Sequence, residues 1–248
     1  MGGRGNVSAA VNLILFDRDE TERPLPRHDP RARHILDVLR RTPGQTFDVG
    51  LVNGPKGKAE LVAFTDDVLT LRFTWHEPDP PKERITLIVG LPRPQTARDI
   101  LRDASTLGAS AMHFVRTDRG ESSYAQSTLW SSGEWARHVR TGVEQAFETH
   151  LPEVTHGRSL ADVISSLPSD SARIALDNYE SPVRLGECQL LVDNVVLAIG
   201  SERGWSPAER ARLRASGFRF AHLGPRVLRT ETACIAALTL VRAQLGLL

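Results

Sequence analysis

Hydrophobic and polar residues alternate along much of the first third of the chain, which is the pattern of half-buried strands. The alternation predicts four strands, at residues 12–16, 46–52, 58–64 and 68–75. Short runs of Pro, Gly, Asn and Asp separate the last three strands, and a helix at residues 32–41 interrupts the series. We therefore predict a small β-barrel-like domain over residues 1–77.

A proline-rich stretch, Glu-Pro-Asp-Pro-Pro-Lys, follows at residues 77–82. Each proline fixes its own φ angle and restricts the residue before it, so this stretch is extended and not helical. We place a linker at residues 78–84 and a second domain at residues 85–248.

Beyond the linker, apolar strands alternate with longer helical segments, which predicts an α/β domain with a largely parallel sheet. The last helix is apolar on nearly every side, so we expect it to be buried in a core or a subunit interface. The predicted strands are residues 85–90, 111–116, 173–177, 195–200 and 218–223, and the predicted helices are residues 96–107, 132–148, 160–167, 206–216 and 230–247.

The composition is that of a globular protein, with 40% hydrophobic and 25% charged residues among 248. No apolar run approaches the roughly 18 to 20 residues of a membrane span, and no convincing cleavage site follows the N-terminus. We therefore expect a cytoplasmic protein without a membrane partner. Cys188 and Cys234 lie outside any CxxC motif and the histidines form no HExxH motif, so we expect no metal site.

Arginine dominates the basic residues, since 28 of the 31 are Arg, although the formal net charge is only +1. Residues 203–229 hold seven Arg against one acid, and a second basic cluster lies within residues 23–41. Planar guanidinium groups suit phosphate, so both clusters are candidate nucleic-acid contacts. A solvated surface is the alternative for each.

Two loops carry the candidate chemistry. Residues 200–204, Gly-Ser-Glu-Arg-Gly, follow a predicted strand and precede a helix, which is where open α/β sheets bind ligands. A plain strand-to-helix turn is the alternative. Residues 223–233, Leu-Gly-Pro-Arg-Val-Leu-Arg-Thr-Glu-Thr-Ala, lead into the last helix. The free backbone N–H groups at the start of this helix, with Thr230 or Thr232 as the cap, could receive an anion.

Residues 197–209 and 223–233 together resemble the I-G-P-E-G-G-[FL]-S-x-x-E and L-G-x-R-[IV]-L-R-[TA]-E-T-A signatures of the ribosomal small-subunit RNA methyltransferase E family. Residues 34–44 resemble its H-x-x-x-V-L-R-x-x-x-G motif. That family methylates N3 of a uridine in 16S rRNA with S-adenosyl-L-methionine. The resemblance implies a PUA-like RNA-binding barrel, then a SPOUT α/β domain with a C-terminal trefoil knot. It also implies a homodimer that acts on 16S rRNA or the small ribosomal subunit.

The resemblance also implies roles for single residues. Arg229 would hold RNA phosphate or a developing uracil oxyanion. Glu202 or Glu231 would be the general base, or would instead bond loop and helix amides. The cofactor pocket would be formed by Leu176, Ile199, Gly200, Ser201, Glu202, Gly204, Leu223, Gly224, Val227, Leu228, Arg229 and Thr230. The expected RNA contacts are Arg23, Arg27, Arg33, His34, Arg40, Arg41 and Arg226.

Among the departures of this chain from the family pattern, those at three positions bear on its function. Ser201 and Arg203 replace the Pro and the second Gly of I-G-P-E-G-G, and Glu148 stands where the family has Arg. Two alternatives follow. The protein could be a SPOUT methyltransferase with a different RNA target, or a catalytically silent RNA-binding protein in which Arg203 blocks the cofactor.

Overall fold

The structure is a computed structural model that describes residues 13–76 and 84–248. The predicted linker, residues 78–84, lies outside the described residues except for Arg84. The chain divides into two compact units, one made of residues 1–80 with 143–150 and the other of residues 81–142 with 151–248. The segment 143–150, which we expected in the second domain, thus groups with the N-terminal unit.

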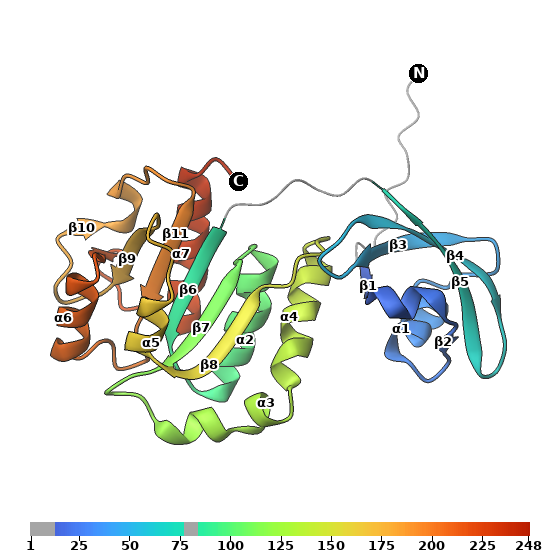
Figure 1. Cartoon of the computed structure of the whole chain (residues 1–248), viewed down its shortest axis with the longest axis horizontal. Coiled ribbons are helices and arrows are strands. Elements are labelled where there is room, and N and C mark those ends of the chain that lie inside the picture. The colour runs from blue at the N-terminus through green and yellow to red at the C-terminus, as the bar shows by residue number, and fades with distance from the viewer. Residues whose placement is uncertain (1–12, 77–83) are drawn as a thin grey trace. The chain divides into compact units, whose positions relative to one another are not determined.

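The N-terminal unit is built on a curled five-stranded sheet with the strand order β1-β3-β4-β5-β2 (Figure 1). β1 pairs with β3 in parallel, and the other neighbours are antiparallel. Alternate residues such as Phe47 and Val49 are buried in a core that also contains Leu61 and Ile35. The strands are β1 (Ile14–Phe16), β2 (Leu25–Pro26), β3 (Thr46–Leu51), β4 (Lys56–Phe64) and β5 (Val68–Trp75).

The helix of this unit differs from the predicted 32–41 at both ends. α1 (Pro30–Arg33) begins two residues earlier because the Asp29 side chain accepts a hydrogen bond from the Arg31 amide and Pro30 occupies the first turn. It continues as the π-helical turn η2 (His34–Val38). Arg40 then adopts a φ of +51°, a left-handed conformation that ends the helix.

Residues 143–150 complete the N-terminal unit. The amide of Leu15 donates to the Glu144 carboxylate over 3.1 Å, so β1 is tied to this segment. Glu148, the position at which the family has Arg, lies 3.6 Å from the Lys56 ammonium group. Its negative charge is therefore balanced within the unit.

The second unit contains a seven-stranded sheet with the order β10-β12-β9-β11-β6-β7-β8 (Figure 1). Every pair of neighbouring strands in it is parallel, which confirms the predicted parallel sheet. The strands are β6 (Arg84–Gly90), β7 (Ala111–Arg116), β8 (Glu153–Ser159), β9 (Ala172–Leu176), β10 (Val183–Arg184), β11 (Asn194–Ile199) and β12 (Arg219–His222).

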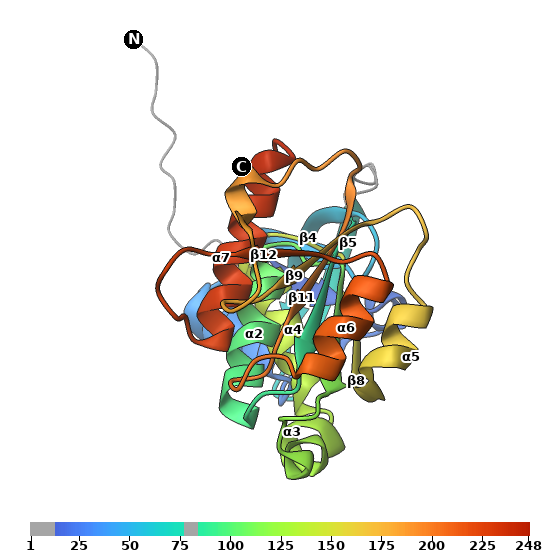
Figure 2. The same cartoon turned by 90° about the vertical axis from the view of Figure 1, so that its left-hand side faces the viewer.

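Helices cover both faces of this sheet, with α2 and α7 on one face and α5 and α6 on the other (Figure 2). The two cores follow from the alternation along each strand. Val195, Leu197 and Ile199 of β11 lie in the core on the α2 and α7 face, whereas Val196 and Ala198 lie in the other core. The helices are α2 (Pro94–Thr106), α3 (Thr128–Ser131), α4 (Glu134–Gln145), α5 (Leu160–Ser165), α6 (Pro207–Ala215) and α7 (Thr230–Gln244), with 3-10 turns η1 (Arg18–Glu22), η3 (Ser122–Gln126) and η4 (Leu185–Glu187).

The start of α6 shows how local sequence sets these elements. The Ser206 hydroxyl accepts a hydrogen bond from the Glu209 amide, and the Glu209 carboxylate accepts one from the Ser206 amide. Gly217, with a φ of +80°, follows the end of the helix. The predicted capping and stop signals of this helix are confirmed, and the helix follows directly on the loop 200–204.

Candidate functional site

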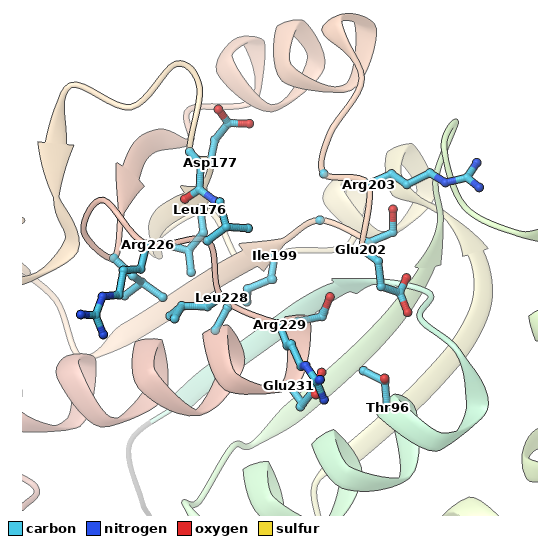
Figure 3. Close-up of a pocket in the computed structure, with 18 of the residues that line it drawn as sticks. Thr96, Leu176, Asp177, Ile199, Glu202, Arg203, Arg226, Leu228, Arg229 and Glu231 are labelled. Atoms are coloured by element: carbon cyan, nitrogen blue, oxygen red, sulfur yellow. The ribbon is translucent and has the colours of Figure 1, made fainter.

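A pocket of about 660 Å³ opens at the carboxyl ends of β9 and β11, beside the segment that joins β12 to α7 (Figure 3). Because these strands are parallel, their ends and the loops that follow them meet at one edge of the sheet. The pocket is lined by Arg93, Thr96, Leu176, Asp177, Asn178, Tyr179, Ile199, Gly200, Ser201, Glu202, Arg203, Gly204, Leu223, Arg226, Val227, Leu228, Arg229, Thr230, Glu231 and Ala233.

The loop after β11 folds tightly on itself. A Cβ added to Gly200 would lie 2.9 Å from the Gly204 Cα, so only glycine permits this turn, and Gly204 itself has a φ of +66°. Ser201 is buried, and its hydroxyl oxygen has no hydrogen-bond partner among the residues that the structure describes. Ser201 lines the pocket, so the pocket wall contains a hydroxyl whose hydrogen-bonding capacity is unused.

Glu202 ties this loop to the beginning of α2. One carboxylate oxygen of Glu202 accepts a hydrogen bond of 3.0 Å from the Arg93 backbone amide, and the same oxygen lies 3.7 Å from the Arg93 Nε. Glu202 thus accepts a hydrogen bond from a backbone amide. This is the contact that we expected if Glu202 supports the loop and is not the general base. Figure 3 shows the Arg203 side chain directed away from Ile199 and Leu228, so it does not cover the apolar side of the pocket.

Two buried side chains fix the end of β9. The Trp205 indole, fully buried, donates to the Leu176 carbonyl over 3.2 Å. The Arg210 Nε donates to the Asp177 carboxylate over 2.7 Å, and both side chains are almost inaccessible to solvent. A paired and hydrogen-bonded charge of this kind holds its loop in one geometry.

The segment between β12 and α7 forms the remaining wall. Leu223 and Leu228 are half-buried in the pocket, whereas Arg226, Val227 and Arg229 are exposed at its rim. The expected helix cap is wrong, because Arg229 is the N-cap residue of α7 and Thr230 is its first helical residue. The Arg229 side chain makes no capping bond, so the amides of the first turn keep their capacity to bind an anion.

The charges around the pocket favour an anionic partner. The four arginines of the lining, Arg93, Arg203, Arg226 and Arg229, are all exposed, and three acidic residues accompany them. One of these acids, Asp177, is already paired with Arg210, which stands behind the lining. The local balance is therefore positive.

The pocket gathers all but one of the predicted cofactor residues. Gly224 is the exception: it has a φ of +106° and shapes the turn beside the pocket without lining it. The predicted bases Glu202 and Glu231 both line the pocket, as does Arg226. The sequence analysis did not identify Arg93 and Thr96 at the start of α2, or Asn178 and Tyr179 after β9, and none of these lies in a signature.

The other predicted RNA contacts all lie in the N-terminal unit. Arg23 is exposed and paired with Asp19, the guanidinium of Arg27 lies 5.4 Å from the Phe64 ring centroid, and Arg33 and Arg40 are exposed. His34 and Arg41 are half-buried.

Arg31, a further member of this basic cluster, is committed to the fold. It pairs with Glu20 and Asp29. Burial of Arg31 lowers its pKa, but the hydrogen bonds to these two carboxylates outweigh this effect, so the pKa lies above its ordinary value. Within residues 13–76 and 84–248, no group of three or more His, Cys, Asp or Glu residues could hold a metal ion, and no helix is long and apolar enough to span a membrane.

Known proteins are similar to this chain in sequence and in fold. Residues 78–242 match a family model described as an RNA methyltransferase domain. The chain is 38% identical over 242 residues to the ribosomal RNA small subunit methyltransferase E of Treponema pallidum, covering 94% of this chain and 91% of that relative. It is 25% identical to ribosomal RNA small subunit methyltransferase E 1 of Borreliella burgdorferi, covering 95% and 99% of the two chains.

Two solved structures show the same fold. One is the ribosomal RNA small subunit methyltransferase E of Neisseria gonorrhoeae bound to S-adenosyl methionine, with a TM-score of 0.78, 22% identity and coverage of 93% and 97%. The other is a probable rRNA-methyltransferase of Porphyromonas gingivalis, with a TM-score of 0.81, 20% identity and coverage of 94% and 99%. From the family model and the Treponema relative, the chain belongs to the ribosomal RNA small subunit methyltransferase E family.

Proposed function

We propose that this protein transfers the methyl group of S-adenosyl-L-methionine to N3 of a uridine in the 16S rRNA of the small ribosomal subunit. The observation that carries the proposal is the pocket, whose lining contains residues of both family signatures. The names of the Treponema and Borreliella relatives support a substrate in small-subunit rRNA.

The residues of the pocket fit S-adenosylmethionine. Leu176, Ile199 and Leu228 offer an apolar slot for adenine, and the tight turn at Gly200 lets backbone amides approach the ligand. The unpartnered Ser201 hydroxyl offers a hydrogen bond, and the first turn of α7 offers amides to the carboxylate of the methionine moiety. The pocket volume is in the range of small-molecule sites.

Methylation at N3 requires that a weakly acidic imide lose its proton while the methyl group is held in line. The bound cofactor supplies an electrophilic methyl group on a sulfonium. We propose that the Glu231 carboxylate accepts the N3 proton, because the Glu202 carboxylate already accepts a hydrogen bond from the Arg93 amide. Arg229, exposed at the rim beside Glu231, would hold an RNA phosphate or the negative charge that develops on the uracil oxygen.

We further propose the finer features of the fold that the family resemblance implies. The curled sheet of the N-terminal unit would be a PUA-like RNA-binding barrel, with Arg23, Arg27, Arg33, Arg40 and Arg41 among its contacts. The α/β unit would be a SPOUT domain whose C-terminal segment forms a trefoil knot. A homodimer is expected, and Leu240, which is 38% exposed on α7, offers apolar surface for it.

The direct test is methyl transfer with purified components. The protein is incubated with labelled S-adenosylmethionine and either small subunits or free 16S rRNA from cells that lack the gene, and the digested nucleosides are separated by mass spectrometry. We expect label in 3-methyluridine. Label in another nucleoside would identify a methyltransferase of different specificity. Cofactor binding without transfer to either RNA, or no cofactor binding at all, would refute the proposed reaction, and the latter result would support the silent RNA-binding alternative.

A further inference from the structure

An aromatic ring stands at the entrance of the pocket without a role in the chemistry above. Tyr179 lines the pocket, yet 80% of its surface is exposed. It belongs to the loop that follows β9 and lies outside both family signatures. A large, exposed aromatic side chain at the rim of a site is a candidate contact for a ligand.

The protein holds the backbone of Tyr179 firmly although the ring is open to solvent. The Asp177 carboxylate accepts hydrogen bonds of 2.8 Å from the amides of both Tyr179 and Glu180, and the Ser181 hydroxyl donates to the Ala221 carbonyl. The loop is thus fastened to its own turn and to β12. Such a fixed loop loses little conformational entropy when its side chain binds a partner.

A buried cation lies against the ring of Tyr179. The Arg210 guanidinium carbon is 5.4 Å from the ring centroid, and Arg210 is itself held by the Asp177 carboxylate. This cation–π contact occupies one side of the ring, and the high exposure of Tyr179 means that the rest remains accessible. The ring is therefore presented as a supported, flat, apolar surface.

The surroundings indicate what such a surface would bind. Arg226 and Arg229, in the segment between β12 and α7, are exposed and line the same pocket, and Val227 between them is 83% exposed. Cationic groups that reach phosphate, combined with an open aromatic ring, form the pattern by which proteins bind single-stranded nucleic acid. The adenine of the cofactor is a poorer match, because the apolar slot formed by Leu176, Ile199 and Leu228 is better shielded from solvent.

We propose that the exposed face of Tyr179 stacks on a nucleobase of the RNA at the entrance of the pocket. This inference rests on the proposed function, since it concerns the RNA substrate of the same site. Stacking on a supported ring would hold an unpaired base next to the pocket and would not depend on which atom is methylated. It assigns to Tyr179 a contact with substrate that neither signature contains.

The experiment compares two strands that carry equal phosphate charge. A fluorescent oligouridine and a strand of equal length made of abasic ribose phosphate are titrated with the full-length protein at one salt concentration. We expect the wild type to prefer oligouridine, and Tyr179→Ala to weaken oligouridine binding about 5- to 100-fold with little change for the abasic strand. Tyr179→Phe, which keeps the ring, should bind oligouridine as the wild type does.

Two controls separate this contact from other effects. Leu191→Ala removes another exposed apolar side chain, 87% exposed and outside the pocket lining, and should leave both affinities unchanged. Calorimetric titration should give the same Kd for S-adenosylmethionine in the wild type, Tyr179→Ala and Tyr179→Phe. A weaker cofactor Kd in Tyr179→Ala alone would show that the ring contacts the cofactor and would overturn the proposal.

Two further outcomes would also overturn it: equal affinity of the wild type for both strands, or an unchanged base preference in Tyr179→Ala. The binding assay involves no methyl transfer, so its result is independent of the proposed reaction. If the nucleoside analysis finds no 3-methyluridine while Tyr179→Ala still loses base preference, then the N3 reaction fails and the stacking contact stands.

Discussion

Replacement of Gly90 by alanine changes the space behind a loop that lines the pocket. Gly90 is the last residue of β6 and does not line the pocket. A Cβ at this position would lie 2.4 Å from the backbone nitrogen of Ser201 and 2.9 Å from Cγ2 of Thr117. Ordinary van der Waals contact begins at 3.4 Å, so the loop at residues 199–204 must move by about 1 Å in Gly90→Ala.

The size of the effect follows from this displacement. Overpacking in a well-packed region costs about 1 to 3 kcal/mol, and the apoprotein can relieve part of it by moving the loop. Binding of S-adenosylmethionine requires the loop in its original position, so the relieved strain returns in the complex. The binding free energy of the cofactor should then weaken by up to the same amount. Its Kd should rise by about 5- to 150-fold.

The assay is calorimetric titration with S-adenosylmethionine, together with thermal unfolding of the apoprotein. Gly186→Ala is the matched control in the same unit, because a Cβ at Gly186 meets no atom within 4 Å and its φ is not positive. The control should keep the wild-type Kd. Wild-type affinity and wild-type Tm in Gly90→Ala would show that the position of the loop does not depend on this close approach.

Three other substitutions test the roles of single side chains. Arg229→Ala should lower the single-turnover rate of methyl transfer far more than the affinity for S-adenosylmethionine measured by calorimetry, and equal losses in both would contradict its assignment to the RNA. Trp205→Phe leaves the Leu176 carbonyl without its buried donor and should lower the free energy of unfolding by about 1 to 3 kcal/mol in urea titrations, whereas an unchanged value would dismiss that bond as a support. Hydrogen bonds from Arg98 and then His138 lower the pKa of Glu134 from 4.5 to about 2, so its stabilisation is complete above pH 4.5 and is lost as the pH falls toward 2. Glu134→Gln should therefore flatten the decline of Tm over that range, and parallel curves for the two proteins would exclude this linkage.

The sequence predicts most strands of the α/β unit because their apolar runs are nearly continuous. The predicted strand 111–116 coincides with β7, and the others differ from the observed strands by at most one residue at each end. β8 and β10 escaped prediction because both lie at the edges of the sheet. Edge strands need no second apolar face, and Glu153–Ser159 contains a single large apolar residue, Val154.

The site residues that belong to a sequence signature could be predicted. Those that reach the site only through the packing of the fold could not. The walls at residues 199–204 and 223–230 follow from local sequence patterns that place loops at strand ends. Gly90, Arg93 and Thr96 join or support the site because β6 lies beside β11, a pairing between segments more than a hundred residues apart. The contact between Glu202 and the Arg93 amide depends on that pairing and could not be derived from either segment alone.

Nucleoside mass spectrometry of small-subunit rRNA shows whether this protein methylates N3 of a uridine in 16S rRNA. The rRNA is compared between cells with the gene, cells without it, and deleted cells that express either the wild type or Arg229→Ala. We expect that 3-methyluridine disappears on deletion and returns with the wild type but not with Arg229→Ala. An unchanged level of 3-methyluridine in the deleted cells would contradict it.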